Sequence, residues 1–172
     1  MWPIRKLDYS RMVAITSTVA LALLDAVHNP DYRVGAVALD RIAVPSDSSV
    51  IEVLIEVLHN RQYASVQNDV RTGVLAWRAV CAFGRIGDAS VVPYLLAAAV
   101  EEFSLLRASV IQSLVQIATR SGDPDVRRVI VRYLIEQQTD HGVVSNFKPW
   151  QVSDEAARGL EALGIITTIC VS

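Results

Sequence analysis

The sequence predicts an all-α protein, an α-solenoid (α-α superhelix) built from about four packed helix pairs. Two observations carry this prediction. A Leu-rich helical pattern recurs along the chain, and it alternates with a second, Ala-rich pattern. Because one period of about 31 residues holds two helix types, the repeat excludes a coiled coil and a β-propeller.

The Leu-rich type is defined by two segments that match position by position. Residues 23–29 read Leu-Leu-Asp-Ala-Val-His-Asn, and residues 54–60 read Leu-Ile-Glu-Val-Leu-His-Asn, at an offset of 31 residues. A third copy at residues 94–101 keeps the apolar spacing but lacks the His-Asn ending. This spacing places the apolar side chains on one face of a helix.

The Ala-rich type occurs at residues 38–42, 82–86 and 113–117, with a degenerate copy that ends at residue 164. Small or apolar residues at positions i, i+1, i+3 and i+4 give a face on which a neighbouring helix can pack closely. Residues 75–88 extend this pattern and read Leu-Ala-Trp-Arg-Ala-Val-Cys-Ala-Phe-Gly-Arg-Ile-Gly-Asp.

This segment resembles the pattern Val-Arg-x-x-Ala-Ala-x-Ala-Leu-Gly-x-Ile-Gly-Asp of HEAT-like repeats of the phycobilisome-lyase type. Ala76 stands where the pattern usually has Arg. The resemblance covers roughly residues 13–164 and implies a stack of HEAT-like helix pairs. It implies no particular activity, because such repeats serve many functions.

The whole chain, residues 1–172, is predicted to form a single domain. Within it we expect a lead-in at 1–12, the repeats at 13–164 and an apolar tail at 165–172. The predicted helices lie near 13–28, 31–43, 49–60, 70–86, 90–101, 103–120, 125–138 and 152–164.

Capping signals agree with these helices. Ser49 begins a Ser-x-x-Glu capping box. Asn29 and Asp123 each precede a proline, and so are predicted N-caps with proline at the first helical position. Gly87 and Gly164 stand where a helix is expected to end.

Composition and charge limit the classes of partner and the cellular compartment that we expect. Hydrophobic residues make up 52% of the chain, and the net charge of −2 gives no overall basic field that would favour nucleic acid as a partner. Cys81 and Cys170 lie far apart without metal-binding spacing, which favours a reduced, cytoplasmic setting. The first apolar run loosely imitates a signal peptide, but Thr16, Ser17 and Thr18 interrupt it. It is also too short to span a membrane.

Two insertions interrupt the period, at Asn60–Thr72 and at Gln138–Gln151. Both follow a Leu-rich helix, so they are predicted to share one edge of the stack, where insertions often form a binding face. Phe147 and Trp150 in the second insertion are candidate anchors for a partner. The alternative is that both rings cover the last helix pair.

The residues that could bind a metal or act in catalysis are interpreted as structural. His28 and His59 hold equivalent positions on adjacent helices, where a last-turn histidine followed by Asn suits helix capping better than metal binding. Cys81 is interpreted as a structural thiol. No catalytic residue, metal site or cofactor is predicted, because the sequence holds no phosphate-binding loop, nucleophile elbow or zinc-ligand spacing.

We therefore expect a non-catalytic protein–protein interaction module, such as an adaptor, an assembly factor or a small inhibitor of the immunity type. Its partner is expected to be another protein, with nucleic acid and membrane both disfavoured. The candidate binding residues are Asp25, Glu52, Glu56, His59, Tyr63, Arg128, Arg132, His141, Phe147 and Trp150. Those on the Leu-rich helices would form a surface that is acidic at one end and basic at the other.

Two other functions stay open. The resemblance allows a HEAT-like enzyme of the lyase or DNA-glycosylase type. The apolar C-terminal tail allows a structural homodimer, because the end of a solenoid needs either a polar cap or a partner.

Overall fold

A computed structural model describes residues 17–43, 47–63, 70–100, 103–144 and 150–165. Over these residues the chain is helical apart from short connections and one isolated β-bridge. The elements are α2 (Thr18–His28), α3 (Tyr32–Arg41), α4 (Ser48–Tyr63), α5 (Val70–Ile86), the 3₁₀ turn η1 (Ala89–Val91), α6 (Val92–Ala98), α7 (Ser104–Arg120), α8 (Pro124–Gln137) and α9 (Val152–Ala162). The predicted all-α class is confirmed.

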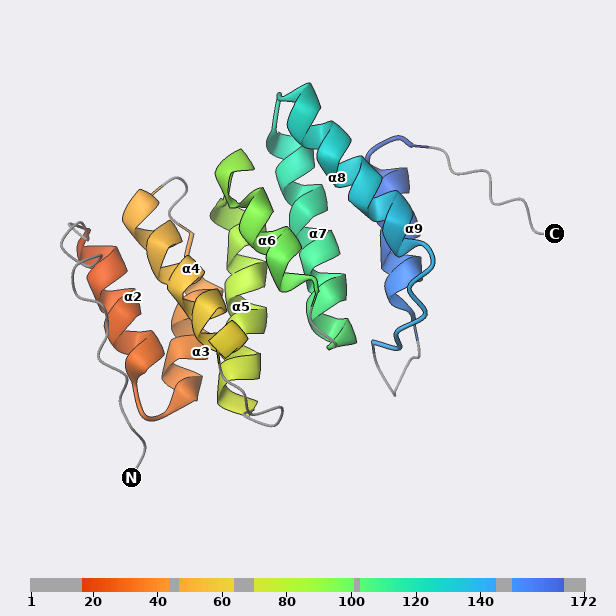
Figure 1. The fold of residues 1–172 in the computed structure, drawn as a ribbon. Helices are drawn as coiled ribbons and strands as arrows, with labels where there is room; N and C mark the ends of the chain where they lie inside the picture. Colours follow the sequence, from red (N-terminus) through yellow and green to blue (C-terminus); the bar gives the residue numbers. More distant parts are fainter. Residues whose placement is uncertain (1–16, 44–46, 64–69, 101–102, 145–149, 166–172) are drawn as a thin grey trace.

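The helices pack as consecutive antiparallel pairs in two layers (Figure 1). The first layer contains α2, α4, α6 and α8, which come from the Leu-rich type. The second layer contains α3, α5, α7 and α9, which come from the Ala-rich type. Each helix of the first layer contacts the helix that follows it in the chain. Each helix type therefore forms a layer of its own.

The second layer is the more closely packed of the two, and its most extensive contact joins α5 to α7. Gly84 of α5 explains how they approach, because a Cβ at this position would lie 2.9 Å from the Cα of Ser113. The Ser113 hydroxyl donates a hydrogen bond of 2.9 Å to the carbonyl of Val80. The small residues that define the Ala-rich type thus permit close packing.

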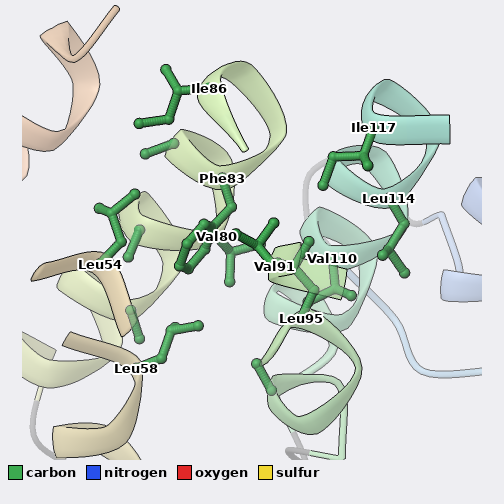
Figure 2. Close-up of a cluster of buried hydrophobic side chains, with 14 of the residues drawn as sticks. Leu54, Leu58, Val80, Phe83, Ile86, Val91, Leu95, Val110, Leu114 and Ile117 are labelled. Atoms are coloured by element: carbon green, nitrogen blue, oxygen red, sulfur yellow. The ribbon is translucent and has the colours of Figure 1, made fainter. Parts of the chain in front are cut away.

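The apolar core lies between the layers. Figure 2 shows its middle part, where fully buried Leu54, Phe83, Leu95 and Leu114 come from α4, α5, α6 and α7. Complete burial of one such side chain stabilises the fold by roughly 1.5–3 kcal/mol. The core therefore holds successive pairs together rather than closing each pair on its own.

Two of the predicted N-caps are wrong. The carboxylate of Asp47 accepts the N–H of Ser49 at 3.0 Å, so α4 begins before Ser49, which is buried inside the helix. α3 is capped by Asp31, while Asn29 ends α2 and accepts the N–H of Asp31 at 2.9 Å. In both places an aspartate carboxylate nearby is the stronger acceptor for the N–H groups of the first turn.

Other local predictions are confirmed. Asp123 caps α8 by accepting the N–H of Asp125, and Pro124 occupies the first helical position. Gly164 follows α9 with φ of +72°, the left-handed conformation that glycine adopts freely. Gly87 follows α5, and its N–H donates to the carbonyl of Phe83 at 2.8 Å.

The predicted helix bounds agree with the described helices to within a few residues. α4 continues to Tyr63, so the beginning of the first insertion extends that helix. The lead-in at 1–12 and most of the apolar tail lie outside the described residues, although Ile165 packs against the core. None of the described helices is long and apolar enough to cross a membrane.

Candidate functional site

The helix ends that border the two insertions lie at one edge of the molecule. α4 and α8 end there, and α5 and α9 begin there (Figure 1). The side chain of Tyr63 and the whole of Phe147 lie outside the described residues. The contribution of these two residues to a binding face therefore stays a prediction.

The described part of the second insertion is fixed to α7 by an ion pair. Arg107 Nε lies 2.7 Å from Asp140 Oδ2 and its Nη2 lies 3.1 Å from Oδ1, with side chains only 16% and 19% exposed. The N–H of Gly142 donates to the same carboxylate at 2.8 Å. The Arg107 guanidinium lowers the pKa of Asp140 below its usual value.

Trp150 lies against α9 at the end of this insertion. Its ring is half-buried, and the guanidinium carbon of Arg158 lies 5.0 Å from the ring centroid. Val143 and Gln151 form the antiparallel bridge at the base of the insertion. His141 is exposed, with Nδ1 3.0 Å from the side-chain oxygen of Gln151. Trp150 thus contacts α9 of the last helix pair, and its role as an anchor for a partner stays a prediction.

The predicted acidic residues lie on α2 and α4. Asp25 and Glu52 are exposed, whereas Glu56 is half-buried with Oε1 3.5 Å from His28 Nε2. His28 Nδ1 lies 2.8 Å from the carbonyl of Leu24. This histidine thus contacts the last turn of its own helix, as predicted for a capping residue.

The remaining predicted residues of the first layer do not converge on these acids. His59 packs edge-to-face on Tyr94 of α6, with ring centroids 6.3 Å apart. Arg128 and Arg132 are exposed on α8 at the far end of the layer (Figure 1), and Arg128 pairs with Asp125 at 2.8 Å. Among the described residues no group of three His, Cys, Asp or Glu side chains could hold a metal ion.

A different set of side chains links three helices of the second layer. Trp77 of α5 donates its indole N–H to the Ser109 hydroxyl of α7 at 2.9 Å. The Arg78 guanidinium carbon lies 4.2 Å from the centroid of the Trp77 ring. Arg78 Nη1 in turn lies 2.9 Å from Oδ1 of Asp40 on α3. We call Asp40, Trp77, Arg78 and Ser109 the second-layer cluster.

The second-layer cluster is held in place and yet reaches solvent. The side chains of Arg78 and Asp40 are 33% and 38% exposed, and Trp77 is half-buried. Ser109 donates its hydroxyl to the carbonyl of Leu105 at 2.8 Å, which leaves its lone pairs to accept from Trp77. Neighbouring helices thus fix the orientation of an aromatic ring and a guanidinium.

Cys81 lies one helical turn after Trp77 and is half-buried. Burial raises the pKa of its thiol, although the nearby charges of Arg85 and Arg78 act in the opposite direction. A thiol that stays protonated is a poor nucleophile. The structural interpretation of Cys81 is therefore favoured.

The first three helix pairs carry opposite charge in their two layers. α3, α5 and α7 together contain seven arginines and one acidic residue, Asp40. α2, α4 and α6 together contain three acidic residues and one arginine. The net charge of −2 for the chain conceals this separation, because the segments outside these six helices carry an excess of acidic residues.

The arginines of the second layer differ in how far they are neutralised. Arg33 pairs with Asp31 at 2.8 Å, and Arg107 pairs with Asp140 at 2.7 Å. Arg85 and Arg120 instead donate to backbone carbonyls, at 2.6 Å and 2.8 Å. Arg41 forms no ion pair with a described residue. The last turns of these helices therefore retain positive charge.

Sequence reasoning selected the Leu-rich helices and missed the second-layer cluster. Trp77 and Arg78 occupy two of the four variable positions of the motif at residues 75–88, which was the available signal. Their partners are 32 and 38 residues away in the chain, so the contacts become evident only in the fold. Comparison with protein-family models, with curated proteins and with solved structures finds no match to this chain.

Proposed function

We propose that this chain is a protein-binding module, a short α-solenoid of HEAT-like helix pairs that receives its partner on the second layer. The consecutive pairs in two layers support the solenoid, because each pair packs mainly on its neighbours. The HEAT-like assignment rests on the motif at residues 75–88, which lies on α5. The second-layer cluster is the observation that carries the binding function.

The packing favours the second layer as the inner side of the stack. A stack of two layers bends toward the layer whose helices lie closer together, because that layer spans the shorter length. Contacts along α3, α5, α7 and α9 are more extensive than those along α2, α4 and α6. Solenoids commonly bind partners on this concave side. The sequence-based prediction instead placed the charged binding surface on the Leu-rich helices, which form the first layer.

Trp77 and Arg78 have the properties of binding anchors. Trp and Arg are enriched among residues that dominate the energetics of protein interfaces. Binding normally costs about 0.5–1.5 kcal/mol for each flexible side chain that becomes ordered. Here the hydrogen bond to Ser109 and the ion pair to Asp40 already order both side chains, so this cost is reduced.

The same geometry favours binding over catalysis of the glycosylase type. Such an enzyme needs a carboxylate that faces the flipped base. Asp40 is the one acidic residue on α3, α5 and α7, and it is engaged by Arg78. The Asp40 carboxylate is therefore engaged in a contact between helices, which supports binding over catalysis.

Site-specific photo-crosslinking in the native host tests this proposal. Gln112 is exposed on α7 and Val129 is exposed on α8, so the photoreactive residue p-benzoylphenylalanine at either position compares the two layers. We expect a discrete cross-linked protein from the Gln112 position and none from the Val129 position. Cross-links from Val129 alone, or none from Gln112, would refute the assignment of the second layer.

A further inference from the structure

Three arginines meet at the last turn of α3. Arg41 belongs to that turn, and Arg85 reaches it from α5 by donating to the carbonyl of Leu39 at 2.6 Å. Arg78 reaches the same turn through its 2.9 Å contact with Asp40. Two neighbouring helices thus bring three arginines to the C-terminal end of α3 in the second layer.

The negative charge at this point is too small to neutralise the three arginines. Asp40 supplies one full negative charge, and the C-terminus of α3 supplies a partial charge of roughly half an electron. The remainder is a net positive charge on a protein whose total charge is −2. This surface therefore attracts negatively charged ligands, although the net negative charge of the whole protein would favour positively charged ones.

Apolar and aromatic side chains border the same arginines. Val37 lies one helical turn before Arg41 on the same face of α3 and is 49% exposed. Trp77 lies under the Arg78 guanidinium. Both lysines of the chain, at positions 6 and 148, lie outside the described residues, so arginine supplies the basic charge of these helices.

This combination fits a protein better than a nucleic acid. Protein interfaces are enriched in arginine and aromatic residues and depleted in lysine. A nucleic acid is held mainly by several cations that track its phosphate backbone. Here two of the three arginines are already bonded to protein atoms, and an exposed aliphatic residue stands beside the third.

We infer that the second layer binds an acidic segment of its protein partner, with Asp or Glu side chains on Arg41, Arg78 and Arg85 and an apolar residue on Val37 and Trp77. The carboxylates complete the neutralisation that Asp40 leaves unfinished. Guanidinium groups suit this role because their planar N–H donors match both oxygens of a carboxylate. This inference rests on the proposed function, and it adds the chemistry of the partner.

Fluorescence anisotropy with the full chain tests this inference. The probe is a fluorescein-labelled peptide of Glu and Leu residues, and it is compared with the same peptide made of Lys and Leu and with a labelled single-stranded oligonucleotide. We expect the acidic peptide to bind most tightly. Its affinity should fall by about tenfold or more between low and high salt, because ions screen the charges.

Two arginine variants of α3 locate the binding. Arg41→Ala should weaken the acidic peptide by about fivefold, since it removes an unpaired charge from the site. Arg33→Ala is the matched control, because it changes the net charge equally but removes an arginine that Asp31 already neutralises. We expect less than about a twofold effect from it. Equal losses from both variants would show binding to overall charge and would overturn the inference.

Other outcomes separate the inference from the proposed function. Tighter binding of the oligonucleotide than of the acidic peptide would overturn the inference in favour of a nucleic acid. If the partner cross-links from Gln112 and excess acidic peptide does not reduce the cross-link, the second layer binds a partner of other chemistry. If the acidic peptide binds at Arg41 and no protein cross-links from Gln112, the proposed function fails while the site chemistry stands.

Discussion

Gly84 lies where α5 approaches α7, and replacing it with alanine tests whether the second layer depends on this close packing. A Cβ would meet the Gln116 side-chain oxygen at 2.6 Å, the Ser113 hydroxyl at 2.8 Å and the Ser113 Cα at 2.9 Å. The Gln116 side chain can move aside. The Ser113 Cα belongs to the backbone of α7, so the two helices must separate before ordinary contact at 3.4 Å is reached.

The expected loss follows from three opposing effects. Overpacking a tight site costs about 1–3 kcal/mol. Displacing Ser113 also weakens its hydrogen bond to Val80, which contributes about 0.5–1.5 kcal/mol. Alanine regains about 0.5–1 kcal/mol through its higher helix propensity. We therefore expect Gly84→Ala to lower the free energy of unfolding by about 2 kcal/mol, which corresponds to roughly 4–8 °C in Tm.

Urea denaturation followed by circular dichroism measures this loss. Gly122→Ala is the control, because nothing lies within 4 Å of a Cβ at that position. We expect the control to be neutral or slightly stabilising, since alanine restricts the unfolded chain. If Gly84→Ala is as stable as Gly122→Ala, the helices do not require this close approach, and the reasoning about the inner layer fails.

Three further predictions concern titratable groups. The pKa of Asp140 is lowered by Arg107, so its stabilisation is present above the unfolded pKa and is lost as the pH falls through the folded value. Urea midpoints should therefore fall more steeply in acid for the wild type than for Asp140→Asn, and parallel curves would contradict the ion pair. Burial raises the pKa of Tyr133 to about 12, with the Asp140 charge adding to it. The stability that is linked to this raised pKa should be fully present below pH 10 and lost as the pH rises toward 12, with ultraviolet absorbance reporting tyrosinate formation. Burial also raises the pKa of the Cys81 thiol, so in a Cys170→Ser background it should react with a disulfide reagent more slowly than in urea; equal rates would refute this.

Local signals of the sequence predict the start of a helix correctly where no second capping residue stands nearby. Asp123 and Pro124 begin α8 as predicted, because the cap and the first turn are adjacent in the chain. Ser49 was a reasonable cap by its own pattern, but Asp47 stands two residues earlier and accepts the same kind of N–H group. The error arose from a nearby competitor and left the helix in place.

The periodicity of the chain by itself determined the all-helical class, the two alternating helix types and the approximate bounds of the helices, because helix formation and apolar patterning act over neighbouring residues. It could not determine which surface carries charge. That was decided by tertiary packing, which collects arginines from α3, α5 and α7 in one layer. The contacts of Trp77 and Arg78 join residues more than 30 positions apart. No local pattern encodes such contacts, because they depend on how closely the helices approach and on which face each helix turns to its neighbours.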